Sequence, residues 1–285
     1  MEPESKYVDL SDIRLHYLEW AGAGRTVVLV HGSGLCADTW GPIARALAPK
    51  FRVLAFDLRG HGDSDKPDGH FTWPEVAGDL PGFIDALGLE DILLVGHSRG
   101  GGVAALGGAQ RPEHVWRMVL MEPTIRLGQP RPPATAAGAS VNPLAEITRR
   151  RRTLWSNHDE VFEAWSRSNT LRTWDRDVLW AYVRGGTRPR EDGQLEIKCP
   201  PAVEAQFYEN PTPDAMYDVL PNIAWPVLLL TTDNPRRQLN ANPGYVALSK
   251  TSRDFRHRIY PGLTHFFPQE RPREVSQAIL DFAIE

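Results

Sequence analysis

The chain has 285 residues, of which 41% are hydrophobic and 24% charged, enough for one large core. Its net charge of −4 excludes a broadly basic surface, so we expect neither nucleic acid nor a membrane as a partner. No apolar run approaches membrane-spanning length, and the polar start "MEPESKYVDL" does not resemble a secretory signal. The two cysteines, Cys36 and Cys199, lack metal-ligand spacing. We therefore expect a cytoplasmic protein with reduced thiols.

The first half of the chain alternates strand and helix patterns. Residues 6–22 alternate apolar and polar side chains around a Ser-Asp turn, which predicts a β-hairpin. Short apolar runs typical of strands buried on both faces follow at 26–30, 51–56, 92–95, 117–121 and 226–230. Helical patterns separate them at 40–49, at 73–89 and after residue 98. This alternation predicts an α/β fold with a mostly parallel sheet and helices on both faces.

The alternation stops near residue 126. Residues 126–143 are rich in Pro, Gly and Ala and are interpreted as a linker. From there to about residue 215 the pattern is helical, without a convincing buried strand, and an amphipathic helix ends the chain. We expect a core formed by residues 1–125 and 216–285, interrupted by a helical cap insertion, residues 126–215, that lies over the sheet.

The segment Gly96-His97-Ser98-Arg99-Gly100 stands between a buried run and a helical pattern. A nucleophilic serine on a sharp strand-to-helix turn needs small neighbours two positions away, which the glycines provide. The Arg99 backbone N–H would begin the helix and point toward a developing oxyanion. The rival interpretation is a glycine-rich turn with an exposed serine, but the strand and helix context favours Ser98 as a nucleophile.

A second glycine-containing loop, "HGSG" at 31–34, follows the strand at 26–30. Such a loop can supply another backbone N–H to an oxyanion. Ser33 is the expected donor and Gly34 the alternative. Alone the loop is typical of an ordinary connection; paired with the Ser98 turn it indicates an oxyanion hole.

Together with "FDLRGHGDSD" at 56–65 and "PGLTH" at 261–265, these motifs make the chain similar to the α/β-hydrolase superfamily over nearly all of its length. The resemblance implies that fold and Ser–His chemistry, but it says little about substrate. In relatives the segment like residues 57–62 is mainly structural, so Asp57, Arg59 and His61 are given no catalytic role. The resemblance also implies the chain order nucleophile, acid, histidine.

The base is expected to be His265, because it follows a strand, "RHRIY", and a Pro-Gly turn. The acid has two candidates. Relatives commonly carry it in the loop after "PVLLL", where the expected position falls on Pro235 and Asp233 is displaced by two residues. Glu122 ends the strand that follows the Ser98 helix, where some esterases and lactonases of the superfamily place their acid. We favour Glu122 over Asp233 as the partner of His265 Nδ1.

The expected cap contains four tryptophans, Trp155, Trp165, Trp174 and Trp180, near helical spacing. Most are expected to pack the cap onto itself, with one or two lining an apolar pocket over the nucleophile. The run of four arginines at 149–152 is interpreted as a solvated helix face rather than an anion site.

The sequence thus predicts a serine hydrolase that cleaves an ester or lactone of a small to medium apolar molecule, without cofactor or metal. A C–C bond hydrolase with the same triad stays open, as does a ligand receptor on a hydrolase scaffold. Dehalogenases and epoxide hydrolases are disfavoured, because they need an aspartate where Ser98 stands. Whether the chain forms a homodimer is also left open.

Overall fold

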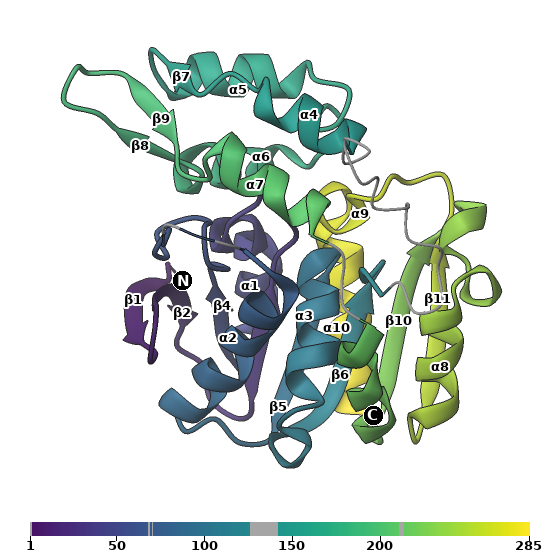
Figure 1. Ribbon diagram of the computed structural model, residues 1–285. Helices are drawn as coiled ribbons and strands as arrows, with labels where there is room; N and C mark the ends of the chain where they lie inside the picture. The colour runs from purple at the N-terminus through teal and green to yellow at the C-terminus, as the bar shows by residue number, and fades with distance from the viewer. Residues whose placement is uncertain (1, 68, 70, 126–141, 211–213) are drawn as a thin grey trace, which may run out of the picture.

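The computed structural model describes residues 2–67, 69, 71–125, 142–210 and 214–285. An eight-stranded sheet with the order β1-β2-β4-β3-β5-β6-β10-β11 runs through the molecule (Figure 1). The β1-β2 and β2-β4 pairs are antiparallel, and every later pair is parallel. The strands are β1 (Glu4–Asp9), β2 (Arg14–Trp20), β3 (Thr26–Val30), β4 (Arg52–Phe56), β5 (Ile92–His97), β6 (Val115–Met121), β10 (Val227–Thr232) and β11 (Phe255–Tyr260).

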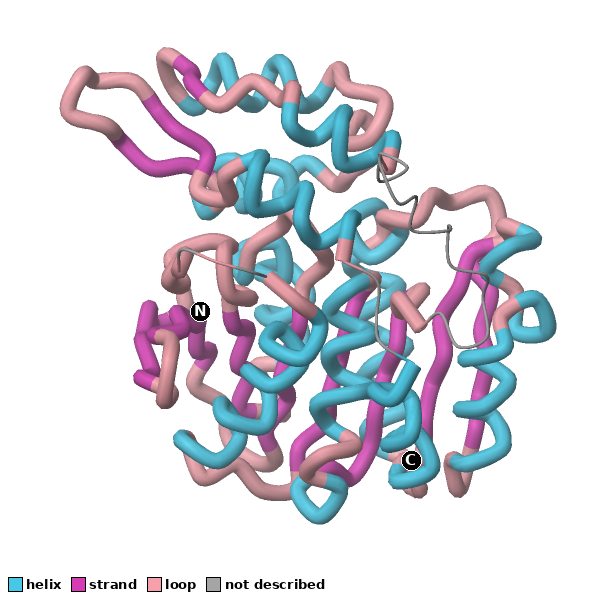
Figure 2. Tube along the Cα trace, viewed as in Figure 1, coloured by secondary structure: helices cyan, strands magenta, loops and turns pink. Residues whose placement is uncertain are grey.

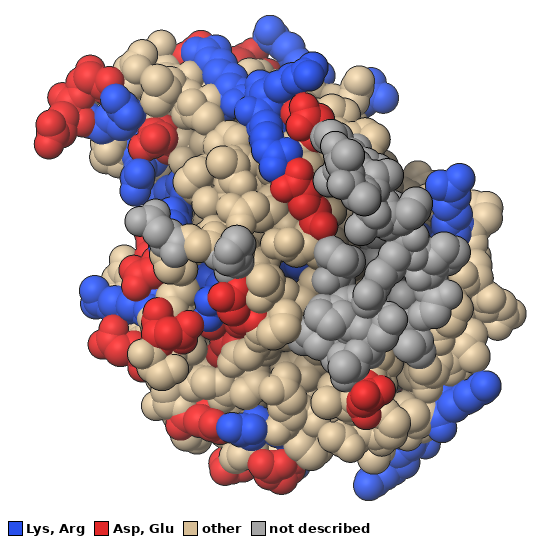
Figure 3. Space-filling model, in the orientation of Figure 1, with Lys and Arg blue, Asp and Glu red and all other residues tan. Residues whose placement is uncertain are grey.

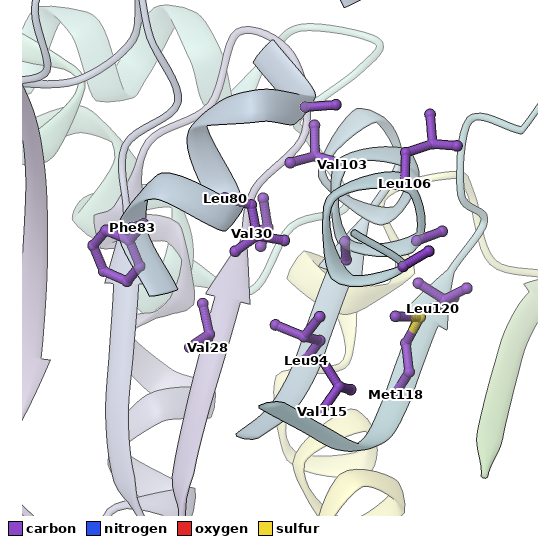
Figure 4. Packing of buried hydrophobic residues seen from close by; sticks show 14 of the residues in the cluster. Val28, Val30, Leu80, Phe83, Leu94, Val103, Leu106, Val115, Met118 and Leu120 are labelled. Atoms are coloured by element: carbon purple, nitrogen blue, oxygen red, sulfur yellow. The ribbon is translucent and has the colours of Figure 1, made fainter. Parts of the chain in front are cut away.

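The central strands carry continuous apolar runs because they are covered on both faces. In β3, Val28 and Val30 point into one core, and Val27 and Leu29 point into another. The same alternation holds in β5, β6 and β10, as expected for a two-residue repeat. Figure 4 shows the first of these cores between the sheet and two helices. This arrangement confirms the predicted α/β class.

Helices cover both faces of the sheet. On the first core lie α2 (Trp73–Ala86), α3 (Arg99–Gly108) and α8 (Pro243–Thr251), and on the second lie α1 (Gly41–Leu47) and α10 (Pro272–Ile284). A short helix, α9 (Phe267–Glu270), precedes α10. Five 3-10 turns complete the described core, η1 (Ala37–Trp40), η2 (Pro112–His114), η3 (Asp214–Asn222), η4 (Pro235–Arg237) and η5 (Leu239–Ala241). No helix in the described ranges is long and apolar enough to cross a membrane.

Between β6 and β10 the chain leaves the sheet and forms a separate layer above it (Figure 1), which we call the cap. Its helices are α4 (Pro143–Arg149), α5 (His158–Ser166), α6 (Arg176–Gly185) and α7 (Pro201–Glu209). It also contains a three-stranded sheet of β7 (Leu154–Trp155), β9 (Leu195–Ile197) and β8 (Thr187–Pro189), visible in Figure 2. The sequence showed no convincing buried strand here, because strands of two or three residues are too short to show a hydrophobic period. The predicted linker lies outside the described residues, except for its last two.

The cap contacts loops at the carboxyl ends of the strands. Tyr182 Oη donates a hydrogen bond to the Gly34 carbonyl, with 2.6 Å between the oxygens. The Asp175 amide donates to the carbonyl of Gln269 in α9, at 2.9 Å. These two bonds tie the cap to the loop after β3 and to the segment after β11. The cap therefore borders the edge where open α/β sheets place their functional residues.

Four consecutive arginines, 149–152, belong to the cap, where Figure 3 shows Lys and Arg side chains gathered. Arg149 pairs with Glu209 at 2.6 Å, and Arg152 pairs with Glu160 at 2.7 Å. Arg151 differs from its neighbours, because it lies 2.8 Å from the buried carboxylate of Glu204. The run is thus divided between exposed pairs and one pair that reaches into the cap.

Glycines let α3 approach the sheet more closely than any other residue would. A Cβ at Gly100 would overlap the carbonyl oxygen of Val30 in β3, and one at Gly96 would overlap the carbonyl of Gly100. In α2, by contrast, a Cβ at Gly78 would meet nothing within 4 Å. The turn between β5 and α3 therefore requires glycine for steric reasons, whereas the middle of α2 does not.

We predict that Gly100→Ala lowers the free energy of unfolding by about 1–3 kcal/mol, because the backbone oxygen it meets cannot move aside cheaply. The matched change Gly78→Ala, in the open middle of a helix, should leave stability unchanged or raise it by up to about 1 kcal/mol. Chemical denaturation of both variants measures the difference. Equal stability of the two variants would contradict the close-packing account.

Candidate active site

Ser98 lies at the turn between β5 and α3 with φ 56° and ψ −119°. The left-handed region is unfavourable for a residue with a side chain, so surrounding bonds must hold it there. The Ser98 amide donates to the Met121 carbonyl at 2.9 Å, and the Ser98 carbonyl accepts from the amides of Gly102 and Thr124. Hydrogen bonds to β6, to α3 and to the residues after β6 thus hold the Ser98 backbone. The Ser98 side chain is half-buried.

The structure brings Ser98, His265 and Glu122 together from three separate loops. His265 Nε2 lies 2.9 Å from Ser98 Oγ, and His265 Nδ1 lies 2.6 Å from Glu122 Oε2. With a carboxylate on Nδ1, that nitrogen carries the proton, so Nε2 can accept the serine proton. The arrangement is an unbroken chain of hydrogen bonds from hydroxyl to carboxylate.

Glu122 directly follows β6 and is fully buried. Its φ of 42° is also left-handed; among the described residues other than glycine, only Asp91, Ser98 and Glu122 have positive φ. The Glu122 amide donates to the Leu230 carbonyl at 2.9 Å, which anchors the strand end to β10. Two of the three unfavourable conformations therefore lie in the hydrogen-bonded chain, as expected where strain places functional groups.

Asp233, the other acid candidate, lies away from the imidazole and is exposed to solvent. Its Oδ2 accepts a hydrogen bond from the Gly262 amide at 3.1 Å. That bond stabilises the Pro261-Gly262 turn three residues before His265. The side chain thus supports a turn, the structural alternative to an acid role for such a residue.

The electrostatics of the pair favour a charged acid and a neutral base. Burial alone would raise the pKa of Glu122, but the hydrogen bond from His265, the Arg237 charge and Thr232 lower it to about 2. Burial and Arg237 lower the pKa of His265, against the opposing effect of Glu122. Because its pKa is lowered, His265 stays neutral, and able to accept a proton, at pH values somewhat below its ordinary pKa.

The candidate oxyanion donors lie on both sides of Ser98. Arg99 begins α3 directly after it, and its Nε donates to Ser33 Oγ at 3.1 Å. This contact places the Ser33 loop against the start of the helix. The amide of the alternative donor, Gly34, donates to His61 Nε2 at 2.9 Å. His61 thereby orients the loop without touching the triad.

Three further residues, which the sequence motifs did not reveal, contact Glu122 or His265. Thr232 donates to Glu122 Oε1 from its amide at 3.0 Å and from its Oγ1 at 2.6 Å. Arg237 Nε lies 3.1 Å from Glu122 Oε2. His97 Nε2 donates to the His265 carbonyl at 2.9 Å, which fixes the loop that carries the base. Only the adjacency of β6 and β10 brings Thr232 to Glu122, so no local sequence signal could have found it.

A cluster with metal-ligand atoms occurs elsewhere, at His16, Asp57 and Asp63. The Asp57 carboxylate already accepts from His16 Nδ1 at 2.7 Å and from the amides of Ala37 and Asp63. Lys198 Nζ lies 2.5 Å from Asp63, where a cation would compete with it. These residues form a saturated hydrogen-bond network and do not fit a metal ion.

One of the four cap tryptophans contacts the segment that carries His265. Trp174 contacts Phe266, the residue after His265, with ring centroids 5.4 Å apart. Trp165 stacks on Tyr182 and Trp180 on Phe162, so these two pack the cap onto itself. Trp155 is buried in the same cap cluster. Of the four tryptophans, Trp174 is therefore the one with a described ring contact to the segment that carries His265.

A groove of about 550 Å³ lies between the β1–β2 turn and α2. It is lined by charged residues that include Arg59 and Asp79, which form a buried ion pair. None of Ser98, Glu122 and His265 lines it. Size alone therefore does not make it a substrate site, and the triad marks the better candidate.

The chain matches the model of the alpha/beta hydrolase family over residues 27–278. N-formylmaleamate deformylase of Pseudomonas putida is 38% identical over 119 residues, 41% of this chain and 44% of the relative. The chain spans between 30% and 44% of the length of the curated relatives it matches.

Two solved structures share the fold over nearly the whole chain. E-2-(acetamidomethylene)succinate hydrolase superposes with a TM-score of 0.77 at 22% identity, covering 99% of this chain and 100% of that one. The enol-lactonase of Burkholderia xenovorans superposes with a TM-score of 0.70 at 23% identity, covering 98% and 100%. With the family match over residues 27–278, the chain belongs to the alpha/beta hydrolase family.

Proposed function

We propose that the protein is a serine hydrolase that cleaves a carboxylic ester or lactone through an acyl-enzyme on Ser98. The observation that carries the proposal is the hydrogen-bonded chain from Ser98 Oγ through His265 to Glu122, at 2.9 Å and 2.6 Å. A serine hydroxyl needs such a base to become a nucleophile, and the base needs the carboxylate to hold its tautomer.

The first half-reaction forms the acyl-enzyme. His265 Nε2 takes the proton of Ser98 as Oγ bonds to the carbonyl carbon, and the carbonyl oxygen becomes an oxyanion. The backbone amides of Ser33 and Arg99 are the proposed donors to that oxygen. The oxyanion then re-forms the carbonyl, the bond to the alcohol oxygen breaks, and His265 protonates the leaving oxygen. Glu122 stays ionised and stabilises the imidazolium throughout.

The second half-reaction releases the acid. A water molecule gives its proton to His265 Nε2 and attacks the acyl carbon, and the Ser98 oxygen leaves with the proton that the imidazolium returns. In a lactone the alcohol and acid belong to one molecule, so the product is a single hydroxy acid.

Three features support the ester or lactone assignment. The nucleophile is a serine, the residue that acyl transfer uses. Phe266 packs its ring against His265, and Trp174 packs on Phe266, so apolar rings adjoin the base, as expected for a small to medium apolar substrate. The similar structures include an enol-lactonase.

The proposed substrate class is tested by a hydrolysis panel of esters and lactones of graded size, with a β-diketone as a probe of C–C cleavage. Ester or lactone turnover by the wild-type protein supports the proposal. Turnover of the β-diketone alone would instead indicate a C–C bond hydrolase with the same triad. Ligand binding without any turnover would indicate a receptor.

We predict that Ser98→Ala loses on the order of 10⁴ to 10⁶ in kcat on the best substrate of that panel. The change removes one oxygen, so thermal denaturation should show a folded protein. Retention of more than about a hundredth of wild-type kcat by a folded variant would refute the nucleophile assignment.

A second prediction separates the two acid candidates. Glu122→Gln should lower kcat/KM by on the order of 10³ to 10⁴, because an amide favours the wrong imidazole tautomer and carries no charge. Asp233→Asn is the matched control and should stay near wild type, since its contact with the Gly262 amide needs only an oxygen. The reverse order of damage would overturn the acid assignment and leave Ser98 and His265 in place.

A further inference from the structure

The end of β10 and the loop after it read Thr-Thr-Asp-Asn-Pro-Arg-Arg over residues 231–237. Its last residue, Arg237, ends η4 and reaches back to the end of β6. Arg237 Nε lies 3.1 Å from Glu122 Oε2, the same oxygen that lies 2.6 Å from His265 Nδ1. The loop that could have supplied the acid therefore supplies a cation that contacts the acid.

Both oxygens of Glu122 are held by two groups each. Oε1 accepts from the amide and the hydroxyl of Thr232, and Oε2 lies between His265 and Arg237. A fully buried carboxylate is costly unless donors and an opposite charge compensate it. Arg237 is 36% exposed, so it brings that charge from the solvent edge without being buried itself.

The charge of Arg237 also acts on the base. A carboxylate alone favours protonation of its imidazole partner, and a nearby cation opposes this. Among the described residues, the ionisable side chains in contact with the His265 ring are Glu122, at 2.6 Å, and His97, whose ring centroid lies 4.8 Å from that of His265. Burial, together with His265, lowers the pKa of His97 to about 3, so His97 is neutral. Arg237 is therefore the cation that offsets the charge of Glu122.

We propose that Arg237 is a positioning residue that shares the Glu122 carboxylate with His265, holds the acid in place, and keeps the histidine neutral at mildly acidic pH. This inference rests on the proposed serine hydrolase chemistry. The inference adds to that chemistry a residue, Arg237, that contacts neither the substrate nor Ser98 and acts through Glu122.

A purely structural role for Arg237 makes a different prediction. The loop has bonds of its own, from the Arg236 amide to Asn234 Oδ1 at 3.0 Å and from Gln238 Nε2 to the Thr232 carbonyl at 2.8 Å. The loop should therefore keep its shape without the Arg237 side chain. If Arg237 only anchored the loop, its removal would lower stability and leave the pH dependence of the base unchanged.

The test follows the reaction of Ser98 with a fluorophosphonate, by intact-protein mass, as a function of pH. This readout needs no identified substrate. For the wild type we expect the second-order rate to fall on acidification with a midpoint below the ordinary value of 6.5. In Arg237→Gln and Arg237→Met the midpoint should move up by about half a unit to one unit, a shift reduced by the partial exposure of the arginine.

Two controls bracket the result. Arg237→Lys retains the charge, so its midpoint should lie closer to the wild type than to the neutral variants. Arg236→Gln removes a neighbouring exposed charge that makes no ion pair among the described residues, and should leave the midpoint unchanged.

An unchanged or lowered midpoint in whichever neutral variant folds overturns the inference, as does an equal shift in Arg236→Gln. A wild type that is folded yet unreactive at Ser98 counts instead against the proposed function. The two failures are therefore distinguishable.

Discussion

The left-handed backbone of Ser98, at the end of a buried strand, is the constraint on which the site depends. It turns the chain so sharply that the hydroxyl leaves the sheet while α3 begins at the next residue. The turn is compatible only with glycine at 96 and 100, where a side chain would meet backbone oxygens. The amide of Ser98 is held by the carbonyl of Met121, so β6 supports the nucleophile one residue before it supplies Glu122. The conformation of the serine and the position of the acid are thus fixed by the same strand end.

The acid in turn depends on the order of the strands. Because β6 lies between β5 and β10, Glu122, the residue directly after β6, contacts His265 and also accepts from Thr232 at the end of β10. The Glu122 backbone has a left-handed φ of 42° at this point. The loop after β10 then serves two supporting purposes: Asp233 stabilises the turn before His265, and Arg237 contacts the acid. The loop after β10 therefore contains an aspartate that contacts the Gly262 amide and an arginine that contacts Glu122.

The sheet, the turn at Ser98 and the placement of Glu122 could be predicted from the sequence. The contacts that support Glu122 and the short cap strands could not. Strands buried on both faces are continuous apolar runs, and the glycines around Ser98 reflect a local steric demand, so both leave a visible pattern. The placement of Glu122 followed from a misfit, since Pro235 stands where an acid is usual. The bond from Gly34 to His61, and the contacts of Thr232 and Arg237 with Glu122, join segments 27, 110 and 115 residues apart. Such contacts depend on the completed fold. The cap strands leave no recognisable sequence pattern, because none is longer than three residues.

The central claim is that Ser98 is the nucleophile of a Ser98–His265–Glu122 triad. The most direct test is to expose the protein to a fluorophosphonate, digest it, and locate the adduct by peptide mass mapping. If Ser98 is the nucleophile and His265 its base, one adduct should form, on the Ser98 hydroxyl, and it should form much more slowly when His265 is changed to alanine. An adduct on another residue, or labelling of Ser98 at the same rate without His265, would contradict it.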